Sequence, residues 1–203
     1  MSDDALRIVP ADQASAADLD AIFGVRGDAA RCSCQWFKVP RREWDDRAPL
    51  EQRRGRLYEQ TGCGDPAATA TSGLVAYLGD EPVGWCAVEP RTAYPALRTK
   101  RVPWAGRDED PDDASVWAVT CFVTRVGFRR RGVMAALAAA TPAFARARGA
   151  RAVEGYPIDV DPGREFSWGE LFVGSRTAFA DAGFSEVSRP TPRRVVMRRE
   201  LRR

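Results

Sequence analysis

One stretch of the sequence combines residue types that bind phosphate groups. It follows the apolar run at residues 116–123, contains three consecutive arginines, and reaches a glycine just before an alanine-rich segment. Unpaired amides at the start of a helix, together with arginine side chains, donate to phosphate oxygens, and glycine permits close backbone approach. We therefore expect a diphosphate to bind the following residues, named here the arginine–glycine loop: Arg129, Arg130, Arg131, Gly132, Val133, Met134 and Ala135. A solvated surface turn would also suit three arginines, but the order strand, loop, glycine and helix favours binding.

The chain contains no histidine. This excludes Ser-His-Asp and Cys-His catalysis, and it leaves carboxylates, hydroxyls, thiols, backbone groups or water for proton transfer. Glu154 is the first candidate for a general base, and a salt-bridged glutamate is the alternative interpretation. Tyr156 lies two residues further along the same predicted strand, so both side chains share one face. Its hydroxyl is a candidate proton donor, or it is an ordinary half-buried tyrosine; Glu89 is a third, weaker candidate for the base.

The five cysteines suggest reduced thiols rather than a disulfide framework. Their number is odd, and Cys86 and Cys121 lie within apolar runs. Cys32 and Cys34 are separated by one residue and are candidates for a reactive pair at an acceptor site. No second pair of ligands accompanies them, so we expect no metal site.

Alternating strand and helix patterns must position these residues. Apolar and alternating runs predict strands, and apolar residues at spacings of three and four predict helices. The predicted strands are residues 6–9, 71–78, 82–88, 116–123, 152–158 and 195–200. The predicted helices are residues 16–25, part of 50–60, 135–148 and 175–182, and irregular segments are expected at residues 27–40 and 89–113.

Length and composition favour one soluble domain spanning residues 1–203. The hydrophobic fraction of 44% and the charged fraction of 29% are typical of a globular protein. A net charge of +3 gives little attraction to nucleic acid or to membranes, and neither is expected as a partner. We found no signal peptide and no membrane-spanning run, so the expected location is cytoplasmic. The sequence does not determine the oligomeric state, and both a monomer and a homodimer are compatible with it.

The arginine–glycine loop resembles the coenzyme A-binding motif of the GNAT superfamily of N-acetyltransferases. Arg129 and Gly132 match that motif, whereas Met134 replaces its usual small residue. The sequence Pro-Val-Gly-Trp at residues 82–85 resembles the third strand of the family, and Ala-Gly-Phe at residues 182–184 resembles the turn after its last helix. The chain is also similar to a branch with an N-terminal Cys-x-Cys-x-Trp segment, here residues 32–36.

This resemblance implies an α+β fold: a splayed, mostly antiparallel mixed sheet of six to seven strands flanked by helices. Acetyl-CoA or another acyl-CoA would be the co-substrate. Backbone groups of Phe122 and Val123 would bind the pantetheine amides, and the arginine–glycine loop would bind the diphosphate. The family commonly uses a tyrosine to protonate the departing thiolate. The corresponding residue here is Phe179, which cannot donate a proton.

Two functions from different classes therefore follow from the sequence. The first is an acyltransferase that moves an acyl group from acyl-CoA to a primary amine by direct attack in a ternary complex. Its acceptor would be a small amine or a protein amino group. The second is a non-catalytic acyl-CoA-binding regulatory or partner module, which Phe179 supports.

Overall fold

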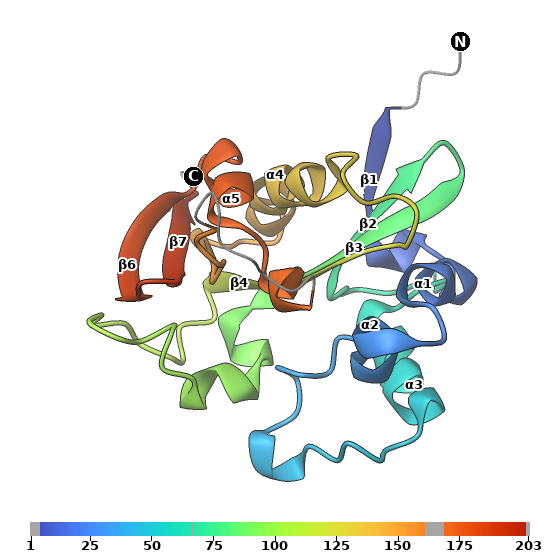
Figure 1. Ribbon diagram of the computed structural model, residues 1–203, viewed down its shortest axis with the longest axis horizontal. Coiled ribbons are helices and arrows are strands. Elements are labelled where there is room, and N and C mark those ends of the chain that lie inside the picture. The colour runs from blue at the N-terminus through green and yellow to red at the C-terminus, as the bar shows by residue number, and fades with distance from the viewer. Residues whose placement is uncertain (1–4, 66, 161–168, 202–203) are drawn as a thin grey trace.

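A seven-stranded sheet in the order β1-β2-β3-β4-β5-β7-β6 forms the centre of the computed structural model (Figure 1). The structure describes residues 5–65, 67–160 and 169–201. The strands are β1 (Leu6–Pro10), β2 (Gly73–Leu78), β3 (Glu81–Pro90), β4 (Val116–Thr124), β5 (Ala152–Gly155), β6 (Ser185–Thr191) and β7 (Arg194–Glu200). All pairs are antiparallel except β4 with β5, which is parallel. This sheet confirms the predicted GNAT-type architecture.

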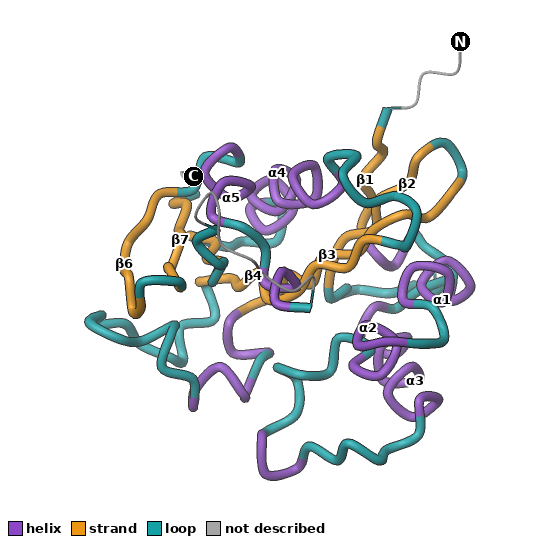
Figure 2. The backbone as a smooth tube through the Cα atoms, viewed as in Figure 1, coloured by secondary structure: helices purple, strands orange, loops and turns teal. Residues whose placement is uncertain are grey.

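Helices cover both faces of the sheet, as the tube in Figure 2 shows. The helices are α1 (Ala16–Phe23), α2 (Gly27–Cys32), α3 (Leu50–Thr61), α4 (Val133–Arg146) and α5 (Arg176–Asp181). Helices α1 to α3 lie on one side and α4 and α5 on the other (Figure 1). Because strand side chains alternate, Leu74 and Ala76 join the core beneath α4, whereas Val75 and Tyr77 join the core beneath α1 and α3.

Helix α4 packs directly on the centre of the sheet because β3 contains a glycine at the contact. A Cβ atom built on Gly84 would overlap the side chain of Val133 and would lie 3.1 Å from Leu137 Cδ1. Val133 and Leu137 are one turn apart on α4, and both are buried. The start of α4, and therefore the arginine–glycine loop before it, is fixed against β3 by this close approach.

Strand β4 contains one residue more than its partner β3 requires. Val88 pairs with Val119 and Ala87 pairs with Cys121, so Thr120 is skipped in the register. As a result, Val119 and Phe122 both face the α4 core although they are three residues apart. This β-bulge turns the second half of β4 relative to the first.

Two elements were missed by the sequence analysis. Helix α2 occupies part of the segment predicted to be irregular, and β6 forms the edge of the sheet beside β7. The long segment between β3 and β4 contains two short 3₁₀ helices, η3 (Arg91–Ala93) and η4 (Pro95–Thr99). A further 3₁₀ turn, η5 (Glu170–Val173), precedes α5 and contacts β4. The remaining predicted helices and strands are present, with ends shifted by a few residues.

Candidate functional site

The sheet divides where β5 leaves β4. Pairing between the two strands runs from Val116 with Ala152 to Val119 with Gly155 and then stops. Beyond this point β4 continues to Thr124, paired only with β3 among the described strands. Phe122 is buried and Val123 is half-buried on this stretch. An extended ligand could therefore lie along the free edge of β4 at these residues.

The arginine–glycine loop follows β4 directly. Arg130 and Gly132 have left-handed backbone conformations, with φ of 62° and 74°. Gly132 is the N-cap of α4, no side chain caps the helix, and the first helical bond runs from Ala136 N to Gly132 O at 2.9 Å. The amides of the three helical residues before Ala136 consequently have no acceptor within the helix. They point outward at the positive end of the helix dipole.

The three arginines precede these amides in the chain. Arg129, Arg130 and Arg131 are all exposed, and a Cβ atom built on Gly132 would meet nothing within 4 Å. The seven predicted residues of the arginine–glycine loop thus form a positively charged helix start, with the three arginines and Gly132 exposed and Val133 buried against the sheet. Unpaired amides of this kind, next to guanidinium groups, are a favourable site for a diphosphate.

The structure brings Glu154 and Tyr156 together, but it surrounds Glu154 with arginines. The side chain of Glu154 is fully buried. Arg198 Nη1 donates to Glu154 Oε1 at 2.7 Å, and Arg107 donates to both carboxylate oxygens, at 3.1 Å to Oε2. The Tyr156 hydroxyl donates to Glu154 Oε2 at 3.3 Å, and Arg91 Nη1 lies 3.5 Å from the same oxygen.

These contacts keep Glu154 ionised. Burial alone would raise the pKa of its carboxyl, but hydrogen bonds and charge from Arg107, with Arg91 and Arg198, hold it below the ordinary value. A low pKa makes a carboxylate a weak proton acceptor. The assignment of Glu154 as base remains a prediction, and its surroundings are those of a buried ion-pair network.

Glu89 has the opposite environment. It lies near the end of β3, opposite Ala118 of β4, and forms a nearly buried ion pair with Lys38. Burial raises the pKa of the Glu89 carboxyl, and the charge of Lys38 offsets only part of this effect. The Tyr94 ring packs beneath the Lys38 ammonium, 4.9 Å from its centroid. A glutamate that has a raised pKa and lies beside β4 is suited to the role of a general base.

Cys34 lies on the same side of the sheet as Glu89. Trp85 Nε1 donates to Cys34 Sγ at 3.3 Å, and the Cys121 thiol of β4 also donates to this sulfur. The hydrogen bond from Cys121 is the main cause that lowers the pKa of Cys34, whereas burial raises the pKa of Cys32 to about 11. Cys34 of the predicted pair therefore contacts β4.

Phe179 is part of the core. Its side chain is fully buried, and its ring centroid lies 5.9 Å from that of Phe122. Cβ atoms built on Gly155 or Gly174 would overlap the Phe179 ring or approach it closely. Phenylalanine at this position fills the space between α5 and the point where β4 and β5 diverge.

The described residues contain neither a cluster suited to a metal ion nor a helix suited to a membrane. No group of three or more cysteine and carboxylate side chains among them is arranged to hold a metal ion. None of their helices combines the length and apolar character needed to cross a bilayer.

Solved structures resemble this chain over nearly its whole length. A GCN5-related N-acetyltransferase from Kribbella flavida is 18% identical, with a TM-score of 0.54, covering 98% of this chain and 100% of the other. YncA from Salmonella typhimurium, solved with its cofactor acetyl-CoA, is 13% identical with a TM-score of 0.53, covering 98% and 95%. An N-acetyltransferase from Staphylococcus aureus Mu50 is 12% identical with a TM-score of 0.53, covering 98% and 99%.

The chain therefore has the fold of the GNAT N-acetyltransferases, as the resemblance of its motifs predicted. No protein-family model matches the sequence, and no curated protein matches it in a sequence search.

Proposed function

We propose that the protein is an acyl-CoA-dependent N-acyltransferase in which an amine attacks the acyl group directly within a ternary complex. The arginine–glycine loop is the observation that carries this proposal. It presents unpaired helix amides and three arginines at the end of β4, just beyond the point where β5 diverges. The similar fold of YncA, which was solved with acetyl-CoA, supports the same cofactor here.

The residues of the site fit an acyl-CoA molecule. The loop amides and arginine side chains would hold the diphosphate, and backbone groups of Phe122 and Val123 would hydrogen-bond the pantetheine arm. Acyl-CoA itself would supply a thioester as the activated acyl donor. The acyl end would then lie near the bulge at Thr120, on the part of β4 that lies opposite the end of β3 and Glu89.

Glu89 is our choice for the base that removes the ammonium proton of the acceptor. Its raised pKa and its position beside β4 support this role. Glu154, the candidate favoured by sequence, is the rival assignment, and its low pKa and arginine contacts argue for a structural role. No tyrosine occupies position 179, and the reaction would proceed without a general acid because a thiolate is a good leaving group even when it is not protonated.

The alternative function is a non-catalytic acyl-CoA-binding module. The burial of Phe179 in the core, where the enzyme family commonly has a tyrosine acid, is the observation that favours it. The two functions share the cofactor site and differ in turnover. Release of free thiol from acetyl-CoA in the presence of an amine panel separates them.

Binding of coenzyme A tests the site directly. Gly132→Ala places a side chain on a residue with a left-handed backbone conformation at the start of α4, which strains the loop. We expect the Kd for coenzyme A, measured by calorimetry, to rise at least about tenfold. This is the effect of losing one to two charge-assisted hydrogen bonds to the diphosphate. Gly127→Ala is the matched control, since Gly127 also has positive φ and open space but precedes the loop. Equal affinity in both variants and the wild type would contradict the proposed cofactor site.

A further inference from the structure

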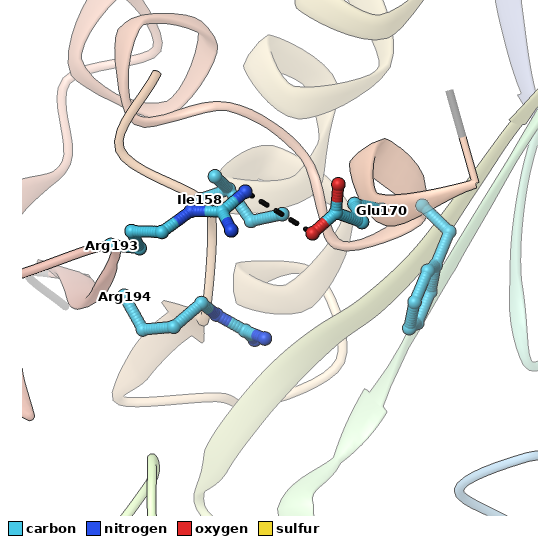
Figure 3. A pocket seen from close by; sticks show the side chains of 5 residues that line it. Ile158, Glu170, Arg193 and Arg194 are labelled. Carbon is cyan, nitrogen blue, oxygen red and sulfur yellow. Dashed lines mark hydrogen bonds and ion pairs between the residues drawn. The ribbon is translucent and has the colours of Figure 1, made fainter. Parts of the chain in front are cut away.

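A cavity lies on the β5 side of the divergence between β4 and β5. Its volume is about 320 Å³, and it is lined by Ile158, Glu170, Phe172, Arg193 and Arg194 (Figure 3). Ile158 follows β5 and forms isolated bridges with Ser175 and Arg194. Glu170 and Phe172 belong to η5, which contacts β4. The cavity is therefore next to the region where the proposed acyl group would lie.

Arg194 is half-buried at this cavity. Its Nη2 donates to the carbonyl oxygen of Tyr156 at 2.8 Å, and its buried Nε has no hydrogen-bond partner. None of the carboxylates in residues 5–65, 67–160 and 169–201 forms an ion pair with it. Burial lowers the pKa of Arg194, consistent with an uncompensated charge. Burying a cation without an anion is costly, so such a group is a candidate for ligand binding.

The neighbouring arginine is arranged differently. Arg193 Nη2 lies 3.1 Å from Glu170 Oε1, and Figure 3 shows this pair above the guanidinium of Arg194. The pair of Arg193 and Glu170 is neutral as a unit, so Arg194 adds one positive charge among the five described lining residues. Ile158 and Phe172 provide apolar surface beside it.

We propose that this cavity binds a carboxylate carried by the amine acceptor, with Arg194 as its counter-ion. A carboxylate brings a single negative charge and matches the geometry of a guanidinium. A phosphate group brings up to two charges at neutral pH, and the Glu170 carboxylate in the same lining disfavours the second. The apolar wall would contact the carbon skeleton of the acceptor.

The inference rests on the proposed function, because it assumes that the acceptor lies beside β4. The Phe172 ring lies 6.3 Å from that of Phe37, in the segment that continues from the Cys-x-Cys-x-Trp motif. This contact joins the cavity to the side of the sheet that holds Lys38 and Glu89. An α-amino acid, or a chain ending in one, is the class of acceptor that fits.

Matched pairs of ligands test the carboxylate. Phenylalanine with phenethylamine, lysine with cadaverine, and methionine with 3-(methylthio)propylamine differ only by that group. In calorimetric titrations with coenzyme A present, we expect at least one amino acid to bind the wild type at least about tenfold more tightly than its amine. Arg194→Gln should abolish this preference. Arg189→Gln, which alters an ion-paired arginine on β6, should retain it.

Several results would overturn the inference. They are the absence of any preference in the wild type, an equal preference in Arg194→Gln, and Arg194-dependent binding of inorganic phosphate without carboxylate preference. Melting temperatures of the two variants within a few degrees of the wild type exclude misfolding, and Arg194→Lys should restore part of the preference. The titrations need no turnover, so thiol release tests the proposed function separately. Equal rates of thiol release with amino acids and with the matching amines would support the acyltransferase function but contradict the proposed preference for a carboxylate.

Discussion

At the scale of single residues, a half-buried and a fully buried glutamate near β4 differ in the number of cations around them. Glu89 faces one lysine, and Glu154 faces three arginines and a tyrosine hydroxyl. Burial raises the pKa of both carboxyls, but only around Glu154 is the opposing charge large enough to reverse the shift. The same side chain therefore suits proton transfer at one position and structural support at the other.

Replacing the base should change both the rate and its pH dependence. We expect Glu89→Gln to lower kcat at least about 100-fold, as is typical for loss of a general base. In the wild type the rate should fall as pH decreases through the raised pKa of Glu89, and this acidic limb should be absent from the variant. Steady-state thiol release between pH 5 and 9 measures both effects. A larger loss in Glu154→Gln, with its acidic limb removed, would instead identify Glu154 as the base.

Removing the charge of Glu154 should destabilise the fold. Glu154→Gln removes the fully buried anion of three largely buried arginines, which keep their ion pairs with Glu109. We therefore expect a loss of about 3 kcal/mol in urea unfolding at pH 7, the low end for a broken buried ion pair. The exposed pair Arg98–Asp112 provides the control, since Asp112→Asn should cost about 0–1 kcal/mol.

The pH dependence of this loss follows from the low pKa of Glu154 in the folded state. Its stabilisation is complete above the unfolded pKa of about 4.3 and disappears as pH falls through the lower folded value. The difference between wild type and Glu154→Gln should therefore shrink below about pH 4. A difference that stays constant with pH would show that packing, and not charge, is responsible.

At the scale of elements, glycines set how closely the layers pack. Gly155→Ala would place a methyl group against the buried ring of Phe179, and overpacking of this kind costs about 1–3 kcal/mol. Gly55 lies in α3 with open space around its Cα, so Gly55→Ala should stabilise by about 1 kcal/mol. Thermal unfolding should show a lower melting temperature for Gly155→Ala and a higher one for Gly55→Ala than for the wild type. A neutral or stabilising Gly155→Ala would mean that α5 moves away from β5 without cost.

The elements that the sequence predicted are those with strong periodicity or a motif. The strand at residues 116–123, the helix after Gly132 and the loop between them were predicted from apolar runs and from residue types. The edge strand β6 contains polar residues and Pro190 and is mostly exposed, so it has no alternating pattern. Helix α2 has six residues, too few for a helical period to show.

Contacts between distant residues could not be predicted in this way. Arg91, Arg107 and Arg198 meet Glu154 only after the β3–β4 segment folds over β7, and nothing local marks them as its partners. Arg194 likewise lies in an arginine-rich stretch of sequence, and only the structure places it at a cavity where no described carboxylate forms an ion pair with it. The sequence does contain one indication of this ion-pair network, which is the high density of arginines and carboxylates in the segment after β3.

At the scale of the whole molecule, one sheet has a large hydrophobic core on each face, and Tyr94, Leu97 and Val196 belong to a third, smaller cluster. Leu137 belongs to the core beneath α4, and Leu57 belongs to the core beneath α1 and α3. Strand β3 contributes to both through alternate residues, for example Cys86 and Trp85. We infer that the two cores unfold together, as the predicted single domain requires.

Truncation in either core tests this cooperativity. Leu57→Ala and Leu137→Ala should each cost about 2–5 kcal/mol, because both side chains are almost completely buried. In urea, tryptophan fluorescence and far-UV circular dichroism should report one shared midpoint for each variant. Separate midpoints in either variant would show that the two layers are independent units.

The extra residue in β4 has a consequence for insertions and deletions. Because Thr120 is skipped in the pairing with β3, its presence decides that Cys121 faces Cys34 and that Phe122 faces Phe179. Deleting Thr120 would restore regular alternation and exchange the faces of every later residue of β4. This single-codon deletion should abolish the fold, although substitution of Thr120 by valine, of similar shape, should preserve it. The length of this strand, more than the identity of the residue there, determines which side chains reach the site.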